Sequence, residues 1–133
     1  MSDDIFSFEV ARATARAELT ESWLAGGTVK VYDGTRPTPT GAAIGAQVLL
    51  TTFTLGTPAG TVTSGVWTAE PIASALVAND GSASWFRAFD ALGVVIADAY
   101  VGATGSGALM ILNNTSLVSG GYVSVVSFTL TEG

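Results

Sequence analysis

The stretch Ser82-Ala-Ser-Trp-Phe-Arg-Ala-Phe-Asp-Ala-Leu-Gly-Val-Val-Ile-Ala-Asp98 has the densest apolar and aromatic composition in the chain. Its aromatic and β-branched residues suit a pleated surface, which predicts two β-strands. Between them, Asp90-Ala-Leu-Gly93 is typical of a four-residue turn, with glycine at the position that most needs a positive φ. The sequence therefore predicts a β-hairpin, around which the rest of the chain is expected to pack.

Both faces of this hairpin carry apolar bulk. Because successive side chains of a strand point to opposite faces, Trp85, Arg87 and Phe89 share one face. Phe86 and Ala88 share the other face. A hairpin that is apolar on both sides belongs in the interior of a sandwich or at a contact between subunits.

An ion pair is expected within the hairpin. If Phe89 opposes Val94 across the turn, Arg87 and Asp98 lie diagonally on the same face. A guanidinium on an otherwise apolar face is costly to bury without a partner. Arg87 and Asp98 are therefore predicted to form a structural pair.

The composition argues against an enzyme and against a nucleic-acid-binding protein. The 133 residues fit one domain and include neither cysteine nor histidine, so the commonest general base, the thiol nucleophile and the soft metal ligands are missing. With a net charge of −6 and only five Lys and Arg residues, the chain lacks the basic patch that phosphate backbones require. We expect no catalytic residue, no metal site and no cofactor.

Sparse charge points instead to partners that cover the surface. Charged residues make up 12% of the chain and hydrophobic residues 48%, which is a low charge density for a small monomer. No apolar run is long enough to span a membrane, and Met1-Ser2-Asp3-Asp4 is acidic where a signal peptide would be basic. The chain is therefore expected to be made in a cytoplasm, without an export signal of its own.

An amphipathic helix is predicted from Phe8 to Ala25, ending at Gly26-Gly27. Its apolar residues recur at three- and four-residue steps and form one stripe: Phe8, Ala11, Ala15, Leu19 and Trp23. Two interpretations stay open, a helix packed on its own domain and a helix docked partly on another subunit. The candidate partner interface consists of Ile5, Phe6, Phe8 and Trp23.

After Gly27 the periodicity changes from helical to alternating. Seven or eight short strands are predicted, among them residues 28–32, 47–55, 66–69, 72–77, 109–112 and 122–131. One helix followed by such strands predicts a mainly β fold, an antiparallel β-sandwich that is jelly-roll-like, with one N-terminal α-helix. The chain is expected to be a single domain over residues 1–133, with an arm and helix over 1–27 and the β-sandwich over 28–133.

Two groups of residues allow a binding interpretation beside an ordinary structural one. The first group could hold a hard cation such as Ca²⁺, although aspartate is common in turns and at strand ends: Asp33, Asp80, Asp90 and Asp98. The second group could form a platform that stacks on sugars, although in a sandwich such rings are more often core: Tyr32, Trp67, Trp85, Tyr100 and Tyr122.

Several short motifs occur in a distinctive order. An Ala-rich helix and Gly26-Gly27 precede Val29-Lys-Val-Tyr-Asp-Gly-Thr-Arg-Pro37. Further motifs follow: Ser64-Gly-Val66, Gly81-Ser-Ala-Ser-Trp-Phe-Arg87, the turn Asp90–Gly93, Leu112-Asn-Asn-Thr-Ser116 and Gly120-Gly-Tyr-Val-Ser-Val125. In order and spacing these motifs resemble a family of small virion structural proteins of tailed bacteriophages and prophages.

The resemblance implies a non-enzymatic virion component, and a capsid decoration (cement) protein is the expected type. Its expected partners are further copies of itself, with a trimer as one candidate oligomer, and the major capsid protein, with no nucleic acid and no membrane. Its expected location is the capsid of the virion, after synthesis in the cytoplasm of a host bacterium. The alternative is a tail, collar or fibre component that binds a host surface or carbohydrate through an aromatic or loop platform.

Overall fold

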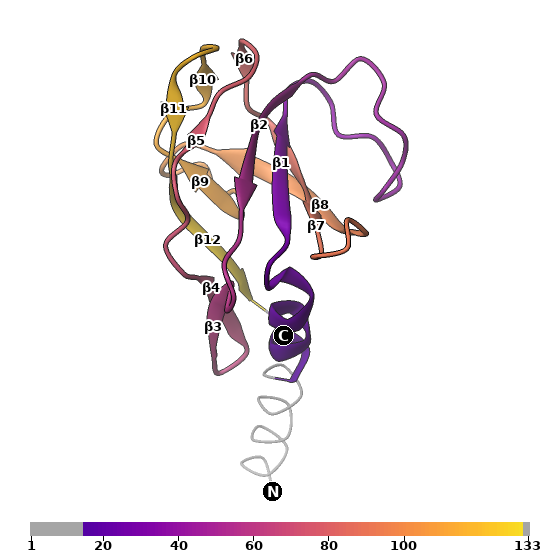
Figure 1. Ribbon diagram of the computed structural model, residues 1–133, viewed down its shortest axis with the longest axis vertical. Helices are drawn as coiled ribbons and strands as arrows, with labels where there is room; N and C mark the ends of the chain where they lie inside the picture. The colour runs from indigo at the N-terminus through magenta and orange to yellow at the C-terminus, as the bar shows by residue number, and fades with distance from the viewer. Residues whose placement is uncertain (1–14, 132–133) are drawn as a thin grey trace, which may run out of the picture.

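The computed structural model describes residues 15–131 and has a mainly β architecture with one helix, at residues 15–24 (Figure 1). The alternating, β-branched segments after Gly27 form short strands, as their periodicity predicts. The strands are β1 Thr28–Tyr32, β2 Leu49–Thr54, β3 Gly60–Thr63, β4 Val66–Ala69, β5 Ala75–Leu76, β6 Gly81–Ser82, β7 Trp85–Phe89, β8 Val95–Gly102, β9 Met110–Leu112, β10 Ser116–Leu117, β11 Tyr122–Val123 and β12 Val125–Thr131.

Eight strands form one large curled sheet in the order β2-β1-β7-β8-β9-β12-β4-β3. Two small two-stranded ladders, β10-β6 and β11-β5, complete the strand pairing of the described residues. The sheet is mixed, because β8 and β9 run parallel, with Val101 beside Met110 and Gly102 beside Ile111. A purely antiparallel sheet is therefore wrong: the connection of residues 103–109 folds back, so that β9 starts beside the end of β8 and runs in the same direction.

The predicted hairpin lies near the middle of the sheet, as β7 and β8. Asp90 Oδ1 accepts hydrogen bonds from the backbone N–H groups of Leu92 and Val94, both at 2.9 Å, and this fixes the turn. The predicted register is wrong: Phe89 pairs with Val95 instead of Val94, and a bulge between Ala88 and Phe89 increases the difference to two residues from Ala88 onward.

One face of the hairpin builds the core. Phe86 and Ala88 point inward beside Val29 and Val31 of β1. Phe128 of β12 packs edge-on against Phe86, with ring centroids 5.3 Å apart. On its other side Phe128 packs edge-on against Trp67, at 5.0 Å, so this aromatic row joins the two halves of the curled sheet.

The opposite face of the hairpin is covered by the long loop between β1 and β2. Tyr32 stacks on Trp85, with ring centroids 4.6 Å apart, and the Trp85 indole N–H donates to the Asp33 carbonyl at 3.1 Å. The loop extends from the end of β1 and folds back towards β8 (Figure 1). Both faces of β7 are therefore buried, as the composition predicts, whereas most of β8 is only partly buried.

The helix covers one end of the curled sheet, but not with the predicted stripe. Ala17 and Leu24 are its buried apolar residues. Leu19 and Trp23 are 49% and 48% exposed, and Ala15 is exposed as well. The described part of the predicted stripe, Ala15, Leu19 and Trp23, therefore faces outward. Phe8 and Ala11, with the rest of the predicted helix before residue 15, lie outside the described residues.

A carboxylate fastens the helix to the sheet. Glu21 Oε1 accepts hydrogen bonds from the Gly60 N–H at 2.7 Å and from the Trp67 indole N–H at 3.0 Å. Glu21 Oε2 accepts a third from the Ala59 N–H at 3.1 Å. These bonds tie the helix to the start of edge strand β3 and to a core tryptophan.

Several strands differ from the expectation, and the two-stranded ladder of β6 and β10 was not predicted. β3 was not predicted, although Ser64 and Gly65 have φ of 49° and 80°, as a two-residue hairpin turn requires. The predicted strand 72–77 is reduced to Ala75–Leu76, since Pro71 precedes it. The predicted strand 122–131 is divided at Ser124, whose N–H donates to the Asn113 side chain instead of to a neighbouring strand.

Candidate functional site

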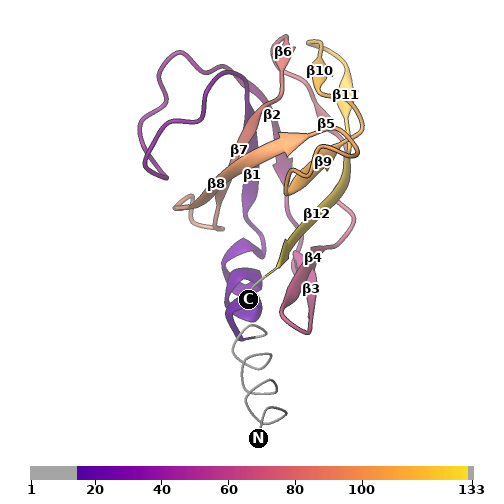
Figure 2. The ribbon, with the colours of Figure 1, turned by 180° about the vertical axis from the view of Figure 1, so that it is seen from behind.

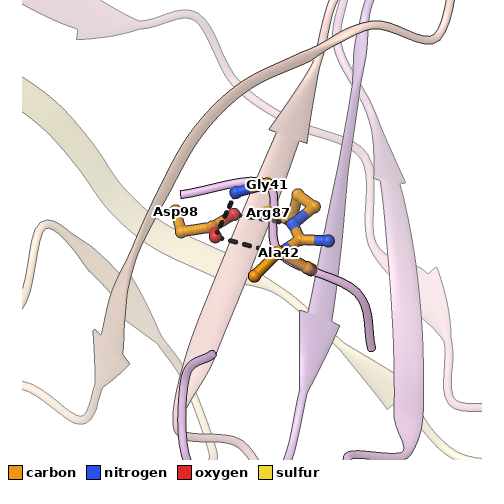
Figure 3. A network of polar contacts seen from close by, with 4 residues as sticks. All are labelled: Gly41, Ala42, Arg87 and Asp98. Atoms are coloured by element: carbon orange, nitrogen blue, oxygen red, sulfur yellow. Dashed lines mark hydrogen bonds and ion pairs between the residues drawn. The ribbon is translucent and has the colours of Figure 1, made fainter. Parts of the chain in front are cut away.

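The structure brings the predicted pair Arg87 and Asp98 together on the loop-covered face of the hairpin (Figure 3). Because of the bulge they lie directly opposite each other, not diagonally. Arg87 Nε donates to Asp98 Oδ1 at 2.8 Å, and Arg87 Nη2 donates to Asp98 Oδ2 at 3.0 Å. This bidentate arrangement is the strongest geometry that a guanidinium and a carboxylate can form.

The loop between β1 and β2 completes this pair. Gly41 N–H donates to Asp98 Oδ2 at 3.1 Å, and Arg87 Nη2 donates to the Ala42 carbonyl at 2.8 Å. Figure 3 shows the loop segment of Gly41 and Ala42 crossing over the strands that carry the pair. The Arg87 side chain is 6% exposed and the Asp98 side chain 0%, so the pair holds the loop and is closed to any solute.

Two pKa values respond to this burial. The hydrogen bond to Asp98 raises the pKa of Arg87 above its ordinary value, against the opposing effect of burial. Burial raises the pKa of Tyr32, while the positive charge of Arg87 opposes the shift and the negative charge of Asp98 adds to it. Both groups keep their neutral-pH protonation states, which is suited to a structural role and not to proton transfer.

The four aspartates considered as cation ligands have separate partners. Asp33 Oδ1 accepts from Val48 N–H, Asp80 Oδ1 from Ser119 N–H, and Asp90 caps its own turn. Asp98 is held by Arg87. Within residues 15–131 no three acidic side chains gather into a potential metal site.

The proposed aromatic platform does not form as a unit. Trp67 and Trp85 are 0% exposed, and Tyr32 is buried in its stack on Trp85. Tyr100 and Tyr122 are exposed, and the Arg36 guanidinium lies 5.4 Å from the Tyr100 ring centroid. Only these two tyrosines offer ring faces to solvent among the five.

An apolar opening of the described surface is lined by residues of β8, β12 and the helix. Figure 2 shows β8 and β12 above the helix. We call it the β8–β12 groove; its volume is about 260 Å³ and its principal apolar lining is Trp23, Ile96, Leu109, Phe128 and Leu130. It adjoins a shallower hollow formed by Trp23, Ile96 and the turn residues Asp90, Val94 and Val95. Trp23 and Ile96 border both, so the two openings form one continuous apolar surface.

Of the predicted interface residues, the structure describes only Trp23, which lies on the rim of this groove. Ile5, Phe6 and Phe8 lie outside the described residues. Sequence reasoning missed the contributions of Ile96, Leu109 and Leu130. No local pattern indicates them, because Ile96 lies in β8, Leu109 in the connection to β9 and Leu130 in β12, and these segments meet only in the folded protein.

Within residues 15–131, no helix is long and apolar enough to cross a membrane. Comparison of the chain with protein-family models, with characterised proteins and with solved structures gives no match. The geometry of the site and the sequence motifs therefore carry the functional inference.

Proposed function

We propose that this protein is a non-enzymatic structural subunit of a tailed-bacteriophage virion, most simply a capsid decoration (cement) protein that binds the head lattice through non-covalent contacts. The observation that carries the proposal is the β8–β12 groove with its exposed rim, Trp23 and Leu109. Trp23 is 48% exposed and Leu109 42% exposed, on a chain in which charged residues are sparse. An apolar opening of this kind is typical of a subunit that buries it against a partner.

The two polar clusters of the fold support a structural role. Arg87 with Asp98 and Glu21 with its three donors are both closed within the protein, where they join separate segments of chain. Neither presents a nucleophile or a base to solvent. The polar side chains of these two clusters hold segments of the chain together. The exposed apolar side chains at the groove are available to bind a partner.

The motif order from Gly26 to Val125 supports the choice of a virion as the assembly. We propose a location on the capsid, with further copies of this chain and the major capsid protein as partners. In this proposal the curled sheet folds over its core as a β-sandwich of the jelly-roll type, which is the architecture expected from the sequence.

A tail, collar or fibre component is the second candidate, and one observation favours it. Tyr122 is 72% exposed and Tyr100 is also exposed, which leaves two aromatic rings available for stacking on a sugar. The three aromatic residues that would have enlarged this platform are buried. The apolar groove is the larger feature, and we therefore favour the capsid.

Binding of the purified protein to undecorated heads and to isolated tails of the encoding phage tests the proposal. We expect co-sedimentation with heads, saturating at a stoichiometry set by the capsid lattice, and increased resistance of the heads to heat. Binding to tails alone, at a few copies per virion, would support the second candidate. Binding to neither would contradict both.

A further inference from the structure

We propose that the β8–β12 groove binds the amino-terminal segment of a second copy of this chain, through Ile5, Phe6 and Phe8. The inference rests on the proposed role as an assembly subunit and names the partner of its apolar surface. It assigns a groove to three of the four residues that the sequence marks as an interface, and the fourth, Trp23, borders that groove.

The groove exists because the sheet opens at this point. Residues 95–100 of β8 pair with β7 on one side, and β9 pairs with β8 only from Val101 onward. On the opposite side, β12 pairs with β4 over Thr129–Thr131, beyond the end of its pairing with β9 at Phe128. The two strand segments thus diverge towards the helix (Figure 2). The groove between them is lined by core side chains, among them Phe86 and Phe128.

The floor of the groove selects an apolar occupant. Phe86, Ala88 and Phe128 line it from the core side, and Ile96 and Leu130 line its walls. Asp98 borders the groove, but its carboxylate is already held by Arg87. A charged or polar segment would lose its hydration here without gaining a partner, whereas large apolar side chains would gain by burial.

The chain contains one apolar cluster beyond the described residues that fits this requirement. Ile5, Phe6, Phe8 and Val10 lie within the first fourteen residues of the sequence, before the described part of the helix. The helix itself supplies Thr20, Trp23 and Leu24 to the groove. Every copy therefore carries both a groove and, a short distance along the chain, a candidate occupant.

Chain geometry favours the groove of a neighbour over the chain's own groove. The helix contributes its carboxyl-terminal half to the groove, from Thr20 onward. If the helix begins at Phe8, as the sequence predicts, twelve residues separate Phe8 from Thr20, which corresponds to about 18 Å along the axis. Phe8 would then be held away from its own groove but would be free to enter that of a second copy.

The outward-facing stripe of the helix is consistent with this exchange. Leu19 and Trp23 lie four residues apart on one side of the helix, and both are about half exposed. A segment that enters the groove past Trp23 would cover these two side chains as well. Each copy gives one segment and receives one, so a reciprocal exchange forms a dimer and a head-to-tail exchange forms a ring where the rotation closes.

Tryptophan fluorescence provides a direct test, because only one of the three indoles is accessible in the described structure. Trp67 and Trp85 are fully buried, so quenching by acrylamide reports on Trp23. For the full chain at high concentration we expect Trp23 to be protected, and dilution should abolish that protection as copies dissociate. The Trp23→Phe variant identifies the quenchable signal, since its emission should be insensitive to acrylamide.

The matched variant is the full chain with Ile5→Ser, Phe6→Ser and Phe8→Ser. It should sediment as a monomer, show an unprotected Trp23 at every concentration and keep the circular dichroism of the folded sheet. A synthetic peptide of residues 1–14 should restore protection to this variant, and the same peptide with the three serines should not. Protection that does not change on dilution would mean that the segment docks on its own chain and would overturn the proposal, as would equal quenching of both proteins.

The test of segment exchange and the head-binding assay can fail separately. Self-association through the groove without binding to heads would contradict the proposed function and leave the segment exchange standing. Binding to heads by the triple-serine variant, with Trp23 unprotected in the full chain, would contradict the exchange alone.

Discussion

Arg87 and Asp98 form a bidentate pair between neighbouring strands, and the β1–β2 loop covers it. Such a pair contributes little net stability relative to an apolar replacement, but the loss of one partner leaves the other charge buried. The loop depends on the same atoms, because Gly41 and Ala42 bind the pair through their backbone. The pair therefore determines where the loop lies.

Asp98→Ala is expected to lower the free energy of unfolding by about 3 kcal/mol, since Arg87 stays buried without its counter-charge. In a double-mutant cycle with Arg87→Met, measured by urea unfolding, the two losses should fall short of additivity by roughly 0.5 kcal/mol or more. Arg87→Met combined with Glu70→Ala, at an exposed carboxylate after β4, is the control cycle and should be additive. Additive losses in the first cycle would contradict the structural role of the pair.

The raised pKa of Tyr32 predicts that the protein loses stability at alkaline pH. Burial raises its pKa in the folded protein above the ordinary value near 10, so the unfolded chain releases the phenolic proton first. The unfolded state then binds fewer protons, and the free energy of unfolding falls as pH rises from about 10 through the folded pKa. Below about pH 10 this contribution is fully present.

Replacing Tyr32 by Phe should remove part of this alkaline loss, as measured by urea unfolding between about pH 8 and pH 11. The matched control is Tyr122→Phe, because that ring lies on the surface. An unchanged slope in Tyr32→Phe would show that other groups cause the alkaline loss.

At the scale of the elements, Glu21 joins the helix to the sheet. Its carboxylate receives two backbone N–H groups at the start of β3 and the indole N–H of buried Trp67. The following connection from helix to β1 is equally constrained, because a Cβ at Gly27 would collide with the Phe89 carbonyl oxygen. The helix is thus fixed at the end from which Trp23 reaches the groove.

Glu21→Ala should destabilise the protein by about 1–3 kcal/mol, because it leaves the Trp67 indole N–H and two backbone donors without their acceptor. Glu21→Gln keeps one acceptor oxygen and should lose less. Glu18→Ala, at an exposed position on the same helix, is the control and should change the unfolding midpoint little. Equal effects of the changes at Glu18 and Glu21 would contradict the role of the carboxylate as a clamp.

At the scale of the whole molecule, the same sheet encloses the hydrophobic core and leaves the β8–β12 groove open beside the helix. Strand pairing is continuous from β2 to β3, yet β8 and β12 separate beyond Met110, the first residue of β9. The opening falls beside the helix, so the groove combines residues distant in sequence, Trp23, Ile96 and Leu130. An isolated subunit exposes this surface, which is the physical reason to expect an assembly.

Local chemistry was sufficient to predict several elements from the sequence. The strand β1, the β7–β8 hairpin and its Asp90 turn follow from alternation and turn residues within a few positions of each other. The proximity of Arg87 and Asp98 followed too, because both possible registers place them on the same face of adjacent strands. The helix end at Gly26-Gly27 was likewise a local property.

Tertiary structure alone decided the rest. Which side of the helix is buried depended on Glu21 and Leu24 meeting the sheet, and this turned the apolar stripe of Leu19 and Trp23 outward. The parallel pairing of β8 with β9, and the groove beside it, depended on long-range closure of the sheet. Periodicity reports that a face is apolar, but the surface that covers it is supplied by residues far along the chain, so only the folded molecule could reveal the groove.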